Sequence, residues 1–569
     1  MTPTRHPPAT LPARPHQKAR LTPCRSSLDR RTPRQRALSL LLAASLGWGS
    51  LMPLQAQTTA PSAVRLPALG EAASDDFNLS EEKRVGEQIM REIRRDPDYI
   101  DDAPLLDYLQ TLWKPLVQAA RQRGDISSDT ERLFPYESFL VRDRSVNAFA
   151  LPGGYVGVHL GLMALTATPD ELASVLAHEL SHITRRHIAR SVSANSRSSS
   201  LGLAAMLLGL LVASRASSVD MAQAAIVGGQ AGMVQAQLNF SRDMEREADR
   251  SGLALMGDAG FAPAGMAGMF DKLDQSSRLN DSGGFPYLRS HPLTVDRIGE
   301  ARQIVQAMGG SSSPPPAPSL HLLMQARARV LMDPSVQALR RLQDLDARGA
   351  MPQLPLADRL AGLYAGALAS SQLREFARAE RNANAAQALL LAGPGPNETV
   401  VPHDARQAFL HLVAQLALAR RDAPRAAVAL ADDAEDHSRA GLLLRADLAL
   451  AVGTAPALDK SSEALQIWVA DHREDASAWS VLGQTAERQG QKLRALRAEA
   501  EAQAALGNLP GAIDRLRAGQ QVARKGGPGT DFIEASVIDA RLRDLLALRR
   551  QLVAHERKQG GGQRSEPAE

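Results

Sequence analysis

The sequence of 569 residues has one cysteine, few aromatic residues and no long hydrophobic run. Aromatic residues make up 4% of the chain, whereas alanine and leucine are abundant in its second half, so the composition favours helices. Two apolar runs, 37–51 and 201–213, are shorter than the roughly 20 residues that a transmembrane helix needs. We therefore expect no helix after the N-terminal region to span a membrane.

The N-terminal region has the features of a secretory signal peptide. Residues 36–56 comprise a basic flank, an apolar run and small residues that end at Ala56. We expect cleavage after Ala56 and hence an exported protein, with a retained membrane anchor as the alternative. The single cysteine, Cys24, would be removed, which leaves no thiol to form an accidental disulfide in an oxidising compartment.

The basic character of the chain also belongs largely to this segment. Residues 1–56 hold nine of the 66 Lys and Arg residues and one of the 62 acids, so their removal changes the formal charge from +4 to −4. The mature chain then has no overall basic footprint, and we expect no nucleic-acid partner.

The length and the composition indicate two folded domains. The segment "GGSSSPPPAPS" at 309–319 can hold no regular element, and it predicts a linker. The predicted segments are a signal peptide at 1–56, a disordered stretch at 57–77, a first domain at 78–308, the linker at 309–319, an all-α repeat domain at 320–557 and a disordered tail at 558–569.

The second domain contains matches to tetratricopeptide repeats. Trp479, Leu482 and Gly483 fit the W-x-x-L-G start of a repeat, and Ala495 and Ala512 lie where the second helix needs a small residue. Stacked repeats form a concave surface that can bind protein segments. The alternative is an irregular helical domain.

The first domain is predicted to be α+β with a small sheet. Ser80 is the expected N-cap of its first helix, and alternation between residues 138 and 158 predicts one or two strands with a turn at Gly153 and Gly154.

The best-defined helix follows these strands. Thr168 is the expected N-cap, Pro169 suits the first helical position, and Glu171 completes a capping box. This helix contains "HELSH" at 178–182, and the motif therefore lies well inside it.

The "HELSH" motif predicts a metal centre. Residues four apart share a face of a helix, so His178 and His182 can bind one metal ion. Glu179 lies beside them, within reach of a metal-bound water. Two histidines as zinc ligands with a glutamate as general base are the zincin arrangement.

A third ligand is needed, and the nearest histidine does not fit. A metzincin would have a histidine at position 188 and a glycine at 185, where this chain has Ile188 and Arg185. His187 is one residue away and, on a continuous helix, would face away from His178. We expect it at the surface.

The acidic segment "MEREADR" supplies a better candidate. Glu245 and Asp249 are four residues apart and share a helical face, whereas Glu247 points elsewhere. We expect Glu245 to be the third ligand and Asp249 to be the acceptor that orients a ligand imidazole. The alternative is that these acids are solvated on an exposed helix.

These motifs together carry a family resemblance. "HELSH" followed by "SRDMEREAD", with "NAFALPGG" before and "SHP" after, resembles the HtpX, Oma and CaaX-prenyl-protease superfamily of zinc metallopeptidases, and within it the periplasmic barrel-assembly-enhancing (BepA-type) branch with tetratricopeptide repeats. The resemblance implies one zinc ion per subunit, a periplasmic location, and outer-membrane barrel proteins or their assembly machinery as partners. It also implies His178, His182 and Glu245 as ligands, Glu179 as base and Asp249 in support.

His291 in "RSHPLTVDR" is the candidate donor to the developing oxyanion. A His-Pro pair after the ligand helix resembles a position that reaches the site in this family. His291 could instead be a fourth zinc ligand that keeps the enzyme latent, or an exposed loop residue.

The expected substrate is an unfolded polypeptide. A strand edge at 147–154 would pair with an extended chain through main-chain hydrogen bonds. The run 201–213 is expected to be a buried helix, or else a mobile or membrane-contacting flap over the site. The sequence thus favours an exported zinc endopeptidase for envelope proteins, with a repeat-based chaperone or scaffold whose protease site is latent as the alternative.

Overall fold

A computed structural model describes seven stretches of the chain. They are residues 77–194, 241–279, 286–307, 318–393, 400–431, 436–526 and 531–561, all within one compact unit that spans residues 70–569. Four predictions fall outside the described residues: the signal peptide, the stretch up to residue 76 that is predicted to be disordered, the apolar run 201–213, and the predicted linker up to residue 317. The predicted domain boundaries therefore stay predictions.

The first part of the described chain combines a four-stranded sheet with helices. The strands are β1 (Tyr99–Ile100), β2 (Glu137–Val141), β3 (Ala148–Leu151) and β4 (Tyr155–His159). The helices are α1 (Leu79–Ile93), α2 (Ala103–Arg123), α3 (Ser128–Leu133), α4 (Leu160–Leu165), α5 (Pro169–Thr184), α6 (His187–Ala194), α10 (Arg242–Asp258), α11 (Ala264–Leu279), α12 (Tyr287–Ser290) and α13 (Val295–Ala307).

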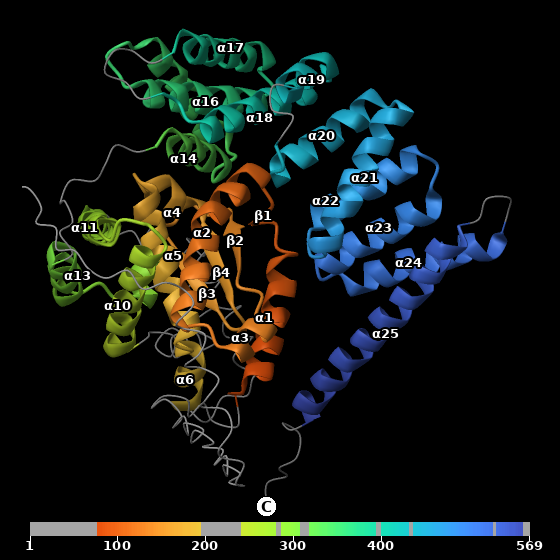
Figure 1. Cartoon of the computed structure of the whole chain (residues 1–569), viewed down its shortest axis with the longest axis horizontal. Coiled ribbons are helices and arrows are strands. Elements are labelled where there is room, and N and C mark those ends of the chain that lie inside the picture. Colours follow the sequence, from red (N-terminus) through yellow and green to blue (C-terminus); the bar gives the residue numbers. More distant parts are fainter. Residues whose placement is uncertain are drawn as a thin grey trace, which may run out of the picture. The chain divides into compact units, whose positions relative to one another are not determined.

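The sheet has the strand order β1-β2-β4-β3 (Figure 1). β2 and β4 are parallel, while β1 pairs with β2 and β3 pairs with β4 in antiparallel fashion. The turn between β3 and β4 contains Gly153 and Gly154 with φ of 79° and 91°, a conformation that glycine adopts without strain. The region predicted to hold one or two strands thus holds three, and β3 is at an edge of the sheet.

Alternation along the strands sends side chains to two different layers. Phe139 and Val141 of β2 pack with residues of α1, whereas Leu140 between them packs with residues of α2 and α5. The sheet is therefore covered on both faces, and α5 lies on the face opposite to α1 (Figure 1).

The helix caps agree with the sequence in one case and differ in the other. Thr168 caps α5, because its side chain accepts the Glu171 N–H at 3.2 Å, and Pro169 is the first residue of the helix. The predicted cap at Ser80 is wrong. Asn78 caps α1 through a 3.0 Å bond from the Glu81 N–H, which starts the helix two residues earlier.

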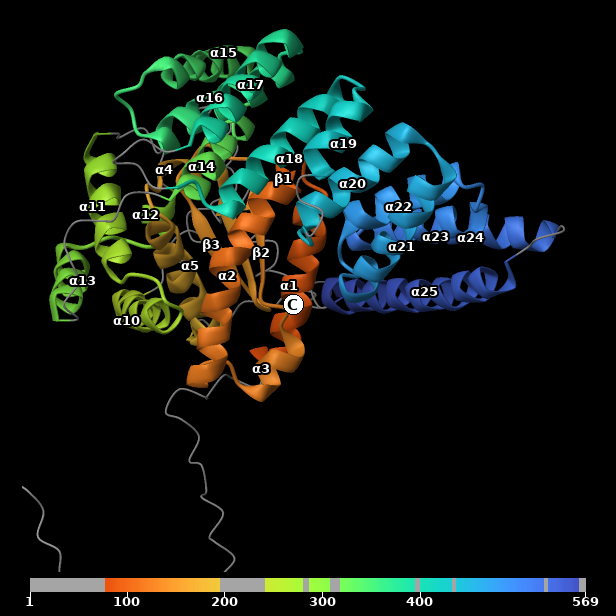
Figure 2. The ribbon, with the colours of Figure 1, turned by 45° about the horizontal axis from the view of Figure 1, so that its top comes forward.

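The second part of the described chain is helical, and successive helices pair (Figure 2). Its elements are α14 (Ser319–Leu331), α15 (Val336–Gln343), the 3₁₀ helix η2 (Asp344–Ala350), α16 (Leu356–Gln372), α17 (Phe376–Ala392), α18 (His403–Ala419), α19 (Ala423–Ala431), α20 (Arg439–Val452), α21 (Ala455–Asp471), α22 (Ala476–Arg488), α23 (Lys492–Ala505), α24 (Leu509–Lys525) and α25 (Phe532–Gly561).

The predicted fold class is confirmed, since a mainly helical chain has one small sheet in its first part. Trp479 and Leu482 are buried in the α22–α23 pair, where the sequence matches a tetratricopeptide repeat; the repeat assignment itself stays a prediction. α25 continues to Gly561 and so includes the start of the segment assigned to a tail. Within the described ranges, none of the helices has the length and apolar character needed to cross a bilayer.

Two arginines, the buried Arg327 and the partly buried Arg439, join the helical part to the N-terminal end of α2. Arg327 donates to both carboxylate oxygens of Asp102 at 2.7 Å. Arg439 donates to both oxygens of Asp101 at 2.7 and 2.8 Å and to both oxygens of Asp475 at 2.7 Å. We call these five residues the junction cluster. They tie α2 to α14, α20 and α22.

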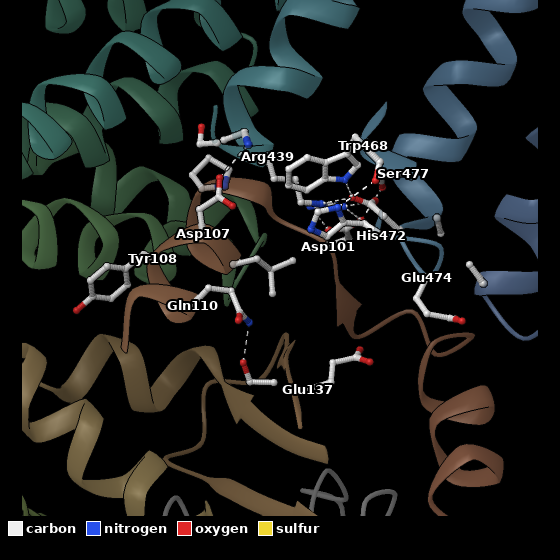
Figure 3. Close-up of a pocket in the computed structure, with 18 of the residues that line it drawn as sticks. Asp101, Asp107, Tyr108, Gln110, Glu137, Arg439, Trp468, His472, Glu474 and Ser477 are labelled. Atoms are coloured by element: carbon white, nitrogen blue, oxygen red, sulfur yellow. Dashed lines mark hydrogen bonds and ion pairs between the residues drawn. The ribbon is translucent and has the colours of Figure 1, made fainter. Parts of the chain in front are cut away.

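A cavity of about 1050 Å³ lies beside this junction. Figure 3 shows Asp101, Asp107, Glu137, Arg439 and Trp468 among the side chains that line it. Its walls come from β1, α2 and β2 on one side and from α18 and α20–α23 on the other. The first and second parts of the described chain therefore share one large hollow.

Candidate metal centre

The site forms where α10 crosses α5. At Gly252 of α10 an added Cβ would lie 3.2 Å from the backbone nitrogen of His178, closer than side-chain contacts normally allow. Glycine here lets the two helix backbones approach, and the face of α10 that carries Gly252 also carries Glu245 and Asp249. The predicted helix pair thus brings its acids to the histidine motif.

His178, His182, Glu245 and His291 form one cluster, with a ligand atom from each within 4.8 Å of all the others. We call it the metal-site cluster. Nε2 of His178 lies 3.0 Å from Nε2 of His182 and 3.4 Å from Oε2 of Glu245. All four side chains are buried. The alternative of solvated acids on an exposed helix is wrong for Glu245 and Asp249.

This donor set suits a divalent metal ion. Nitrogen atoms of three imidazoles face one another, and hydrogen bonds among them cannot satisfy every lone pair. A buried carboxylate completes the group. Two histidines and a glutamate are a donor set that zinc hydrolases use, and the fourth group, His291, is also a competent ligand.

Glu179 lies between the cluster and the edge of the sheet. Its Oε2 accepts the backbone N–H of Ala150 in β3 at 2.9 Å. In the described part of the chain no hydrogen bond satisfies Oε1, which is 3.5 Å from Nε2 of His291. One oxygen is therefore held by β3, and the other is free to accept a proton near the cluster.

Asp249 lies behind the cluster, as the sequence predicted. Its Oδ1 is 2.9 Å from Nδ1 of His178, on the side of the ring away from the other histidines. Arg297 was not anticipated from the sequence. Its guanidinium donates to both oxygens of Asp249 at 2.6 and 2.8 Å and lies 2.9 Å from Oε2 of Glu245. Two buried acids on one face were the signal that a buried cation was needed.

His291 is buried in the cluster, so the exposed-loop alternative is wrong. Its Nδ1 lies 3.0 Å from Oε1 of Glu245, and its ring stacks on Tyr287 at a centroid distance of 4.6 Å. The Tyr287 N–H donates to the carbonyl of Val146, just before β3, and so anchors this loop to the edge strand. Tyr287 too was missed from the sequence.

The prediction of a surface position for His187 is wrong. The chain leaves the helical path at Arg186, which has a φ of 53°, and His187 turns back into the protein. The ring is fully buried, with Nδ1 2.9 Å from Nδ1 of His182 and Nε2 3.3 Å from Oε2 of Glu247. Glu247, which points away from the cluster as expected, thus contacts it indirectly.

The two histidines of the motif have opposite electrostatic environments. Burial lowers the pKa of His178, but Asp249 and Glu245 outweigh burial and raise the pKa to about 9. Burial and the charge on His178 hold the pKa of His182 well below its usual value. Because a metal binds the deprotonated ring, metal binding would displace the proton of His178.

The two acids of the site, Glu179 and Glu245, have pKa values that are shifted in opposite directions. Burial raises the pKa of the Glu179 carboxyl, against the opposing effect of His291 and His178. Burial would raise the pKa of Glu245 as well, but the same two histidines reverse its effect and hold the pKa well below the usual value. Glu245 is therefore an anion suited to a cation, whereas Glu179 is poised to exchange a proton.

Comparisons with known proteins agree with this geometry. Residues 111–305 match the family described as Peptidase family M48. The chain is 28% identical to the beta-barrel assembly-enhancing protease of Escherichia coli (strain K12) over 492 residues, which cover 86% of this chain and 93% of that protein.

Two further relatives match a smaller part of the chain. A Vibrio cholerae protein, which carries the same description with its assignment marked as provisional, is 37% identical over 240 residues, 42% of this chain and 47% of that protein. The mitochondrial metalloendopeptidase OMA1 of Schizosaccharomyces pombe is 28% identical over 240 residues, 41% of this chain and 64% of that protein. Residues 111–305 are a peptidase family M48 domain, and the chain that carries it is a metallopeptidase.

Proposed function

We propose that this metallopeptidase is an exported, zinc-dependent endopeptidase that cleaves extended segments of misfolded or stalled envelope proteins and so supports outer-membrane protein assembly. The names of the Escherichia coli and Vibrio cholerae relatives refer to beta-barrel assembly, and they support the proposed role in outer-membrane protein assembly. The location in the periplasm and the cleavage after Ala56 belong to this proposal.

The single observation that carries the proposal is the convergence of a buried ligand set with a base and a strand edge. His178, His182 and Glu245 meet within 4.8 Å, and Glu179 joins them directly to β3 through the Ala150 N–H. A cluster of this composition beside a polypeptide-binding edge suits hydrolysis of a peptide bond.

Zinc would be held by His178, His182 and Glu245, with Asp249 orienting the first imidazole. When bound, a zinc ion lowers the pKa of a water molecule and polarises the scissile carbonyl. The carboxylate of Glu179 would take up a proton at Oε1, the oxygen with no hydrogen-bond partner in the described structure, and deliver it to the leaving amine. Burial, which raises the pKa of this group, makes its carboxylate a stronger proton acceptor.

The substrate would lie along β3. Within the described ranges no strand pairs with the outer side of β3, so its main-chain groups can bind an extended polypeptide as a further strand. This recognition uses the main chain and implies low sequence selectivity, which suits unfolded segments.

The helical part would select partners such as barrel proteins or their assembly machinery. The cavity beside the junction cluster has walls from both parts of the chain and is large enough for a peptide segment. The helical pairs predicted to be tetratricopeptide repeats provide the surface around it.

The position of His291 favours a second candidate, a repeat-based chaperone or scaffold whose protease site is latent. Its Nδ1 is 3.0 Å from Oε1 of Glu245 and 3.4 Å from Nε2 of His178, which suits a fourth ligand that would block the open position. If His291 instead stabilises the oxyanion, His291→Ala lowers kcat; if it blocks the site, the same variant raises kcat.

The test of the proposal compares wild type with Glu179→Gln on an unfolded polypeptide. Loss of the base should lower kcat by about 10²–10⁴-fold while the zinc content stays unchanged. Glu171→Gln, the same change two turns earlier in α5, is the matched control and should keep its activity. Equal activity of wild type and Glu179→Gln would rule out the enzyme function. Mass spectrometry of the mature N-terminus tests the export step.

A further inference from the structure

We infer that His187 is a positioning residue, which fixes the ring orientation and the tautomer of the candidate ligand His182. It does so through a series of hydrogen bonds that runs from His182 to His187 and ends at Glu247. This inference deepens the proposed function and rests on it. It gives each motif histidine its own support, since His178 is supported separately by Asp249.

A break in the helix brings His187 into place. α5 ends at Thr184, and Arg186 has the left-handed φ of 53°, which a non-glycine residue adopts only at a cost. The side chain of Arg186 donates to Oε2 of Glu82 in α1 at 3.0 and 3.1 Å and to the carbonyl of Phe77. The fold therefore holds a strained turn whose result is that His187 faces His182.

Metal binding through Nε2 of His182 would select one arrangement of protons along these contacts. Nε2 of His182 faces the cluster, 3.0 Å from Nε2 of His178, so that nitrogen must be free of a proton to bind a metal. The proton of His182 is then on Nδ1, which is 2.9 Å from Nδ1 of His187 and donates to it. For His187 to accept there, its own proton must be on Nε2, which is 3.3 Å from the Glu247 carboxylate.

Glu247 is itself held in position. Its Oε2 accepts from Arg190 at 3.0 Å, and its Oε1 lies 3.9 Å from Nε of Arg185. The carboxylate is half-buried and outside the metal-site cluster, so it can stay charged and accept a hydrogen bond from Nε2 of His187. Supporting hydrogen bonds of this kind fix the tautomer and the orientation of a ligand imidazole.

The test measures zinc affinity of the full-length mature chain by competition with a chromophoric chelator. His187→Leu, which removes the acceptor, should weaken zinc binding by about 10–100-fold. His187→Gln keeps a side-chain oxygen that can accept from Nδ1 and should recover part of the loss. The visible absorption of the Co²⁺-substituted protein should change in His187→Leu, because the orientation of one ligand changes.

The matched control is His411→Leu in α18, which also removes a buried imidazole paired with a carboxylate. It should leave zinc affinity and the Co²⁺ spectrum unchanged. If His187→Leu does not fold, Glu247→Leu replaces it as the test variant, because Glu247 is half-buried and ends the series of hydrogen bonds. It should weaken zinc binding by a smaller factor. Wild-type affinity in whichever of these two variants is measured overturns the inference. Failure of wild type itself to bind zinc, or wild-type binding in His178→Ala, overturns the proposed function instead.

Discussion

The metal-site cluster and the junction cluster both bring several charged side chains together, but they differ in how those charges are matched. At the junction, Arg327 and Arg439 each form bidentate pairs with carboxylates. Within the described residues, no buried side-chain atom of the five junction residues lacks a hydrogen-bond partner. At the metal site, imidazole nitrogens face one another, and Oε1 of Glu179 has no hydrogen bond from any described residue.

The difference teaches how structural and functional charge can be distinguished. Matched donors and acceptors satisfy one another, so the junction needs nothing further to be stable. Imidazole nitrogens and a carboxylate that converge on one point suit a cation instead. Arg297 is the partial exception, since it compensates Asp249 and Glu245 from behind and leaves the front of the cluster to a ligand.

The largest expected effect comes from removing one arginine in each region, Arg297 behind the metal-site cluster and Arg327 in the junction cluster. Arg297→Met should lose about 3–5 kcal/mol of unfolding free energy without metal, because it leaves buried carboxylates uncompensated, and saturating zinc should restore part of the loss. Arg327→Met should lose a similar amount that zinc does not restore. Urea unfolding in EDTA and in zinc measures both, and an equal response of the two variants to zinc would contradict the distinction.

A smaller effect is expected at Asp249. Asp249→Asn should weaken zinc binding by about 10–100-fold. An uncharged amide accepts a weaker hydrogen bond from the His178 ring than a carboxylate does, and it can turn either its oxygen or its nitrogen towards that ring. Asp475→Asn, the equivalent change in the junction, should leave zinc affinity as in wild type. Chelator competition on both variants provides the measurement. Undiminished affinity in Asp249→Asn would show that Arg297 alone positions the site.

The smallest effect is expected from a buried contact between a histidine and an aspartate in the helical part. Nε2 of His411 lies 2.8 Å from Oδ2 of Asp436, and although burial would raise the pKa of Asp436, His411 and Ser438 lower it from 3.8 to about 2. The folded pKa is below the unfolded one, so the stabilisation is complete above pH 4 and is lost as the pH falls towards 2. Asp436→Asn should therefore be roughly 1–2 kcal/mol less stable than wild type at pH 7.

The gap between Asp436→Asn and wild type should close between pH 4 and pH 2 in denaturant unfolding. A gap that stayed constant over this range would mean that packing, and not charge, accounts for the effect. Zinc should leave the gap unchanged, as expected for a matched pair.

Local features of the chain predicted much of the candidate site. The capping residues define α5, and spacing along it puts His178 and His182 on one face; the same rule puts Glu245 and Asp249 together on α10. These relations depend on 3.6 residues per turn and on hydrogen bonds within a few residues, which a sequence displays directly.

The positions of His187, Arg297 and Tyr287 could not be predicted in this way. His187 was placed on a continuous helix, whereas the turn at Arg186 depends on Glu82 and Phe77, about a hundred residues away. Arg297 reaches Asp249 only because α13 packs near α10. Such contacts depend on which surfaces meet in the folded chain.

The sequence by itself determined a mainly helical protein, a capped helix with two histidines on one face and a second helix with two acids on one face, because each follows from local geometry. The tertiary structure decided that β3 is an edge strand beside Glu179, that His291 enters the cluster, and that a buried arginine and a fourth histidine, His187, lie against it. These outcomes depend on the close approach of helices and strands distant in sequence, and the physical reason is packing, which periodicity along the chain does not encode.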